Sequence, residues 1–177
     1  MSRITLVTGG SRSGKSRYAM ELAMAFPRRL FVATAVPFDE EMKQRIAKHR
    51  AERGEAFRTV EETENLASVL RAVPPDIQVV LIDCLTVWIG NLMHRHGAEQ
   101  AWFPAIDEFL AALTPPRCHI ILVTNEVGMG IVPEHPMGRR FRDIAGAVNG
   151  RVAAAADRVV FMVSGIPMVI KDGGRVP

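Results

Sequence analysis

Short apolar runs alternate with amphipathic segments along most of the chain. Runs of strand length lie at residues 4–8, 30–34, 57–61, 77–83, 119–124 and 159–163, and residues 168–171 are a candidate terminal edge strand. Between them, apolar residues spaced three and four apart predict helices at 19–26, 40–53, 66–72, 85–93, 106–113 and 141–155. The continuously apolar stretch 79–82 is typical of strands buried on both faces of a parallel sheet. This alternation predicts an α/β fold with a mostly parallel sheet flanked by helices.

The first apolar run leads directly into a glycine-rich segment that matches the phosphate-binding pattern G-x-x-x-x-G-K-[ST]. Its residues are Gly9, Gly10, Ser11, Arg12, Ser13, Gly14, Lys15 and Ser16. A strand, a glycine-rich turn and a helix in this order point backbone N–H groups and the positive end of the helix dipole at a polyphosphate. We expect Lys15 to reach the β- and γ-phosphates and the Ser16 hydroxyl to ligate Mg²⁺. An ordinary glycine-rich turn is the alternative, but the agreement of motif and flanks favours a nucleotide site.

Polar residues at the carboxyl ends of the predicted strands are the next candidates, because ligands of such sheets collect there. Asp83 follows four apolar residues, the pattern by which phosphate-loop proteins bring a carboxylate to magnesium. A helix cap is the alternative role for this aspartate. Thr34 ends the second strand, and Asn125 and Glu126 end the fifth. Glu126 is equally compatible with orienting a nucleophile, binding substrate, or accepting hydrogen bonds from loop amides.

His49 belongs to the predicted helix 40–53, for which Asp39 is the expected N-cap. Helical spacing places it on one face with Met42 and Ile46, directed toward the protein body. A structural histidine is the commoner explanation for such a position. Several basic residues surround it, and they would hold phosphates and favour the neutral, nucleophilic imidazole. They are Arg45, Lys48, Arg50, Arg53 and Arg58. For Arg45 and Lys48, a solvated helix face is the favoured interpretation.

Bulk properties limit the functional classes. With 177 residues, of which 48% are hydrophobic, the chain fits a single nucleotide-binding domain spanning residues 1–177. The net charge of +3 is too small to indicate nucleic-acid binding, but it suits an anionic substrate. Cys84 and Cys118 lie in or beside apolar runs, which favours buried thiols in a reducing cytoplasm over a disulfide. We find neither a signal sequence nor an apolar stretch long enough to span a bilayer, so we expect a cytoplasmic protein.

The chain as a whole resembles the bifunctional adenosylcobinamide kinase/adenosylcobinamide-phosphate guanylyltransferases of cobalamin nucleotide-loop assembly. The resemblance covers nearly the full length, and its ordered set of motifs is far more specific than the phosphate loop alone. These motifs lie at residues 6–17, 33–35, 39–42, 45–46, 49, 58–61, 123–133, 141–146, 148–149 and 163–167.

The resemblance implies a RecA-like fold, a homotrimer and two reactions at one nucleotide site. In the first, ATP or GTP phosphorylates the hydroxyl of adenosylcobinamide. In the second, a histidine, here His49 by its position in the motif, takes GMP from GTP and passes it to the cobinamide phosphate. Beyond residues 9–16, the implied nucleotide contacts are Thr34, Ala35, Val36, Arg50, Ala51, Glu52, Arg53, Glu61 and Asp83.

Three other functions compete with this one. A phosphate-loop kinase of small alcohols would not need His49. A RecA-like motor would use the basic segment 139–142 on nucleic acid, but no aromatic stacking platform accompanies it. A signalling GTPase would carry an N/T-K-x-D guanine-recognition motif, which the sequence lacks.

Overall fold

The computed structural model describes residues 3–37 and 40–173, but not the side chains of residues 41, 42, 45, 48, 49, 52 and 53. Its centre is a seven-stranded sheet in the order β3-β2-β4-β5-β1-β6-β7. The first six strands of that order pair in parallel, and β7 pairs antiparallel with β6. The strands are β1 (Ile4–Gly9), β2 (Arg29–Ala33), β3 (Arg58–Glu61), β4 (Val79–Asp83), β5 (His119–Val123), β6 (Arg158–Val163) and β7 (Ile166–Lys171).

The helices follow the predicted amphipathic segments. They are α1 (Lys15–Ala23), α2 (Glu40–Arg53), α3 (Leu66–Arg71), α4 (Leu85–His96), α5 (Pro104–Leu113) and α6 (Pro136–Ala155), with a short 3₁₀ turn, η1 (Gly54–Ala56), after α2. Several helix ends differ from expectation, among them the end of α1 and the start of α6. Helix α1 stops before Phe26, and α6 begins before Phe141 because Pro136 starts its first turn. The expected N-cap of α2, Asp39, lies outside the described residues.

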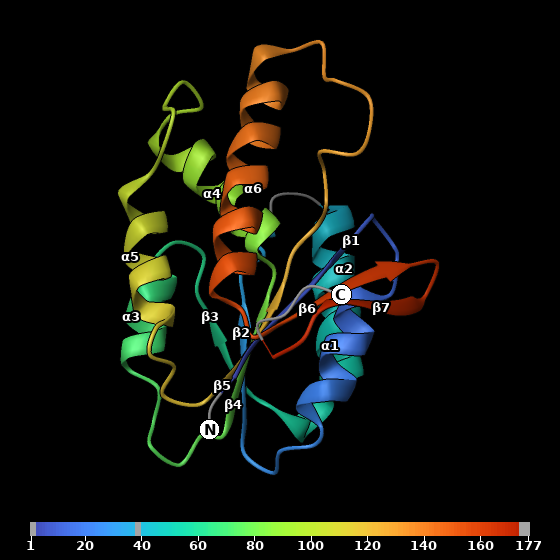
Figure 1. Cartoon of the computed structure of the whole chain (residues 1–177), viewed down its shortest axis with the longest axis vertical. Coiled ribbons are helices and arrows are strands. Elements are labelled where there is room, and N and C mark those ends of the chain that lie inside the picture. Colours follow the sequence, from blue (N-terminus) through green and yellow to red (C-terminus); the bar gives the residue numbers. More distant parts are fainter. Residues whose placement is uncertain (1–2, 38–39, 174–177) are drawn as a thin grey trace.

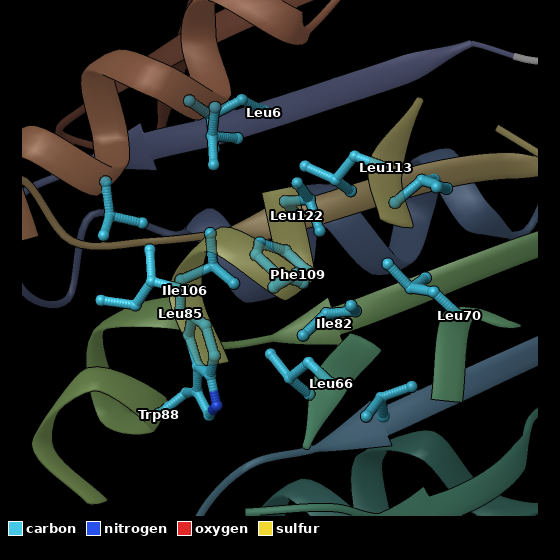
Figure 2. Close-up of a cluster of buried hydrophobic side chains, with 14 of the residues drawn as sticks. Leu6, Leu66, Leu70, Ile82, Leu85, Trp88, Ile106, Phe109, Leu113 and Leu122 are labelled. Atoms are coloured by element: carbon cyan, nitrogen blue, oxygen red, sulfur yellow. The ribbon is translucent and has the colours of Figure 1, made fainter. Parts of the chain in front are cut away.

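The sheet separates two apolar layers. In Figure 1, α3, α4, α5 and α6 lie on one side of the strands, and α1 and α2 lie on the other. The larger core fills the first side, where Trp88 packs 5.1 Å from Phe109 between ring centroids (Figure 2). The smaller core joins α1 to the opposite face through Ala19, Ala23 and Phe31. Alternate residues of β4 enter different cores, as expected of a strand that is buried on both faces.

The predicted α/β architecture is therefore confirmed. Strand β5 lies between β1, which leads into the phosphate loop, and β4, which ends at Asp83, as expected for a RecA-like phosphate-loop fold. Both cysteines are free thiols; Cys118 is buried and Cys84 partly buried. Among the described residues, no helix has the length and apolar character that a membrane crossing requires.

Candidate active site

The phosphate loop adopts a conformation that only glycine tolerates at two of its positions. Gly9 has a φ of 145°, and a Cβ there would lie 2.5 Å from the Met162 carbonyl oxygen of β6. Gly14 has a φ of 90° and is the N-cap of α1, which receives no side-chain capping bond. The first amides of α1 therefore face the cleft without an internal acceptor, which is the arrangement that binds a phosphate anion.

The turn between β6 and β7 supports the phosphate loop from behind. The Gly165 amide donates a hydrogen bond to the Ser13 carbonyl at 3.2 Å. The Gly165 Cα would lie 3.6 Å from a Cβ built on Gly14. A distant part of the chain thus fixes the backbone that would surround the phosphates.

Lys15 is the buried cation of the loop, with only 6% of its surface exposed. Its Nζ donates to the Gly10 carbonyl at 2.5 Å and to Ser13 Oγ at 3.3 Å. Burial lowers the pKa of Lys15, and the nearby Cys84 and Asp83 act in the opposite direction. The ammonium group is therefore held inside the loop, close to the carboxylate at the end of β4.

Thr34 fixes the turn that carries this carboxylate. Its buried hydroxyl donates to the Cys84 carbonyl and accepts from the Cys84 amide, both at 2.8 Å. Asn91 in turn donates to the Thr34 carbonyl at 2.8 Å. Burial, and next the charge of Asp83, raise the pKa of the Cys84 thiol to about 12, so this thiol is protonated at neutral pH. Thr34 and Cys84 therefore support the site through structure rather than through nucleophilic chemistry.

A cleft of about 830 Å³ opens in front of the phosphate loop. The residues predicted from sequence that line it are Ser11, Arg12, Ser13, Gly14, Lys15, Ser16, Ala35, Arg50, Glu61 and Asp83. Gly9, Gly10, Thr34, Val36 and Ala51 lie outside this lining. The cleft thus brings the loop, the β4 carboxylate and part of α2 together.

Helix α2 forms the wall of the cleft opposite the sheet. Its described lining residues are Lys43, Ile46, Ala47 and Arg50. The Arg50 guanidinium forms an ion pair with the Glu61 carboxylate of β3, which links the helix to the body of the protein. His49 lies on α2 next to Arg50, but its side chain is outside the described part of the structure, as are those of Glu52 and Arg53.

Sequence reasoning gave no role to several residues that line the cleft. They are Arg17, Met20, Phe31, Ala33, Pro37, Lys43, Ile46, Ala47, Cys84, Val87, Val123 and Asn125. Asn125 was already a candidate from the sequence because it follows β5, at the same edge as Asp83, but the sequence assigned it no function. The facing residues of α1, α2 and α4 leave no such signal, because only tertiary packing brings those helices together.

A buried network fixes the backbone of Asn125. Its amide donates to Thr86 Oγ1 at 2.6 Å, and its carbonyl accepts from Asn149 Nδ2 at 3.0 Å. Thr124 Oγ1 lies 3.1 Å from Thr86 Oγ1 and donates to Asn149 Oδ1 at 2.8 Å. The network therefore joins β5, α4 and α6 directly behind the cleft.

Glu126 makes a local contact. One carboxylate oxygen accepts from the Gly128 amide at 2.9 Å. This bond agrees with the loop-amide role among the three that the sequence allowed.

Sequence comparisons with known proteins point to one family. Residues 5–170 match the family model described as cobinamide kinase / cobinamide phosphate guanyltransferase. The bifunctional adenosylcobalamin biosynthesis protein CobU of Escherichia coli (strain K12) is 44% identical over 178 residues, which cover 94% of this chain and 98% of that protein. CobU of Salmonella typhimurium (strain LT2) is 45% identical over 179 residues, with the same coverage. A crystal structure of the RadB recombinase aligns with a TM-score of 0.47 and 15% identity, over 90% of this chain and 73% of that one. The chain belongs to the cobinamide kinase / cobinamide phosphate guanyltransferase family.

Proposed function

We propose that this protein phosphorylates adenosylcobinamide with ATP or GTP and then transfers GMP from GTP to the product, which yields adenosylcobinamide-GDP. The observation that carries the proposal is the cleft, in which a complete phosphate loop faces the Asp83 carboxylate. Membership of the family supplies the identity of the acceptor. Both reactions need a bound nucleoside triphosphate, so a single nucleotide site serves them in turn.

The phosphate loop and its neighbours bind the nucleotide in this proposal. The loop of residues 9–16 surrounds the phosphates with its amides, and its residues 11–16 line the cleft. Ala35, Arg50 and Glu61 contact the rest of the molecule from the cleft walls. Thr34, Val36, Ala51, Glu52 and Arg53 complete the proposed set by family resemblance. Ser16 and Asp83 offer a hydroxyl and a carboxylate oxygen, which are donors of the kind that Mg²⁺ prefers beside phosphates and water. When bound there, the ion neutralises charge on the phosphates.

In the kinase reaction, the acceptor hydroxyl oxygen attacks the terminal phosphorus, and the bond to the bridging oxygen breaks. Lys15 stabilises the charge that develops on the phosphoryl oxygens, because its ammonium group is already fixed in the loop. Asp83 stands on the same side of the cleft, beside Lys15.

In the guanylyl transfer, an imidazole nitrogen of His49 attacks the α-phosphorus of GTP. Pyrophosphate leaves with the electrons of the broken phosphorus–oxygen bond, and GMP stays on the histidine as a phosphoramidate. A phosphate oxygen of adenosylcobinamide phosphate then attacks the same phosphorus, and the phosphorus–nitrogen bond breaks. The position of His49 on α2, the helix that forms one wall of the cleft, supports this role.

Trapping of the intermediate tests the proposal. The protein is incubated with GTP labelled at the α-phosphate and Mg²⁺, then denatured. We expect label on the protein that acid removes and alkali does not. His49→Ala and His49→Asn should lose this label and guanylyl transfer while they still phosphorylate adenosylcobinamide. A wild-type protein that phosphorylates adenosylcobinamide but never takes up label would instead be a kinase alone.

We further propose a homotrimer in the cytoplasm. Edge strand β7 exposes apolar side chains, among them Ile166 at 65% and Met168 at 51%. An apolar patch on an edge strand is typical of a surface that another chain covers. The two free thiols are compatible with a reducing compartment.

A further inference from the structure

A second cavity, of about 460 Å³, lies beside the nucleotide cleft between α4 and α6. Its lining residues are Thr86, Val87, Gly90, Asn91, His94 and Phe141. Val87 also lines the nucleotide cleft, so this one side chain borders both cavities. We call the second cavity the α4–α6 groove.

The position of the groove relative to the phosphates gives it a specific use. Lys15 and Asp83 mark the end of the cleft where the terminal phosphate of the donor would lie, and Val87 lies in the first turn of α4, just after Asp83. The acceptor must bring its hydroxyl to this terminal phosphate. The rest of the acceptor molecule would therefore lie next to the α4–α6 groove.

The chemistry of the groove differs from that of the cleft. The cleft is lined by Arg12, Lys15, Arg17, Lys43 and Arg50, which suit phosphates. No Lys, Arg, Asp or Glu is among the described residues that line the groove. Its two buried polar side chains already have partners, because Thr86 contacts Thr124 and Asn91 donates to the Thr34 and Thr63 carbonyls. The groove therefore offers an apolar surface of Val87, Gly90 and Phe141, with the exposed His94 beside it.

We propose that the α4–α6 groove binds an edge of the corrin ring of the acceptor, while the arm that carries the hydroxyl passes Val87 to the phosphates. The methyl-bearing, uncharged edge of a corrinoid matches the apolar lining, whereas a nucleotide would leave its charges there uncompensated. The inference rests on the proposed function, because that function defines the acceptor. It adds a substrate-binding role for Gly90 and Phe141.

A larger side chain at Gly90, which lies on α4, would fill the groove. A Cβ at this position would lie 4.0 Å from Phe141 Cε2, which is ordinary van der Waals contact, and no atom outside the adjoining backbone of α4 lies closer. Alanine therefore fits, whereas the larger side chain of Gly90→Leu extends into the groove. Gly146→Leu on α6 is the matched control, because nothing lies within 4 Å of a Cβ there and the position is exposed.

The experiment compares these variants with adenosylcobinamide as the acceptor. We expect Gly90→Leu to raise the KM for adenosylcobinamide about tenfold or more, and Gly146→Leu to leave it near the wild-type value. Nucleotide affinity and acceptor-independent labelling by GTP should stay unchanged in both variants. If Gly90→Leu melts early, Phe141→Leu replaces it, and a rise in the same KM is expected.

The two proposals fail in different ways. Wild-type protein that binds GTP but does not phosphorylate adenosylcobinamide would overturn the proposed function. Equilibrium binding of adenosylcobinamide to wild type and Gly90→Leu would still test the groove. A folded Gly90→Leu protein with the acceptor KM and affinity of Gly146→Leu would overturn the groove assignment alone.

Discussion

At the scale of single residues, Lys15 combines a functional requirement with a cost to folding. Its ammonium group is buried, and this burial lowers the pKa of Lys15 below its ordinary value of 10.5. The folded protein therefore binds the proton less tightly than the unfolded chain does. At pH values below the pKa of Lys15 in the folded protein, this cost lowers the free energy of unfolding by its full amount. The free energy of unfolding then rises as the pH increases from the folded to the unfolded pKa of Lys15.

We predict that Lys15→Met lowers activity without lowering stability. Without the buried charge, the nucleotide-free variant should be as stable as wild type or more stable, by up to about 1 kcal/mol at neutral pH. Phosphoryl transfer should fall about a hundredfold or more, because the developing charge loses its cation. Urea denaturation at neutral pH and at pH values approaching 10.5 measures the first effect, which should shrink as the pH rises. A variant much less stable than wild type at neutral pH would show that the hydrogen bonds of Lys15 outweigh its desolvation.

At the scale of elements, the apolar periodicity was sufficient to predict every strand and α-helix, but not what happens at their ends. Phe26 continues the apolar spacing of α1, yet the chain leaves the helix before it and buries the ring partly against the smaller core. Helix α6 starts at Pro136, ahead of its first predicted apolar residue. The phosphate loop and Asp83 were predictable because local sequence specifies them. The Thr86–Thr124–Asn149 network was not, because its members come from three elements far apart in sequence.

We predict that substitutions in this network and in the cleft that it supports have different effects on stability. Asn149→Ala should lower the free energy of unfolding by about 1–3 kcal/mol, because it leaves the Asn125 carbonyl without the partner that the structure gives it. It should also lower kcat. Asn125→Ala should change stability by less than about 0.5 kcal/mol but reduce kcat about tenfold or more, because Asn125 lines the cleft and the variant loses its side-chain amide. Chemical denaturation and steady-state kinetics on the same samples test both. Equal losses of unfolding free energy in Asn149→Ala and Asn125→Ala would contradict this prediction.

At the scale of the whole molecule, the distribution of apolar surface is uneven. Both faces of the sheet are covered by helices, but β7 leaves Ile166, Met168, Val169 and Ile170 exposed by 39% or more. Alternation along the strand places Ile166 and Met168 on the same face, ahead of a register shift at Ile170. The sequence indicated an edge strand at 168–171 but could not reveal an uncovered face, because exposure depends on which helices reach that edge.

We predict that Met168→Glu disrupts the homotrimer. A carboxylate in a covered apolar contact would be desolvated without a partner, so the variant should sediment as a smaller species than wild type. Met24→Glu is a matched control, because Met24 and Met168 are both 51% exposed and Met24 lies at the end of α1. Light scattering or sedimentation gives the masses. Wild-type protein that is monomeric, or a Met168→Glu variant that remains a trimer, would exclude this face as the interface.

The contact between Gly9 and β6 also determines when the site can exist during synthesis. The ribosome delivers β1 and the phosphate loop before the partners of β1, which are β5 and β6, and before the turn with Gly165 that contacts Ser13. A nascent chain that ends before β6 therefore has the phosphate-binding motif without its supporting backbone, and its apolar first strand lacks that neighbour. Because pairing of β1 closes long loops, we expect the nucleotide site to be among the last parts of the molecule to form. Until then, the first strand is a segment that chaperones would bind.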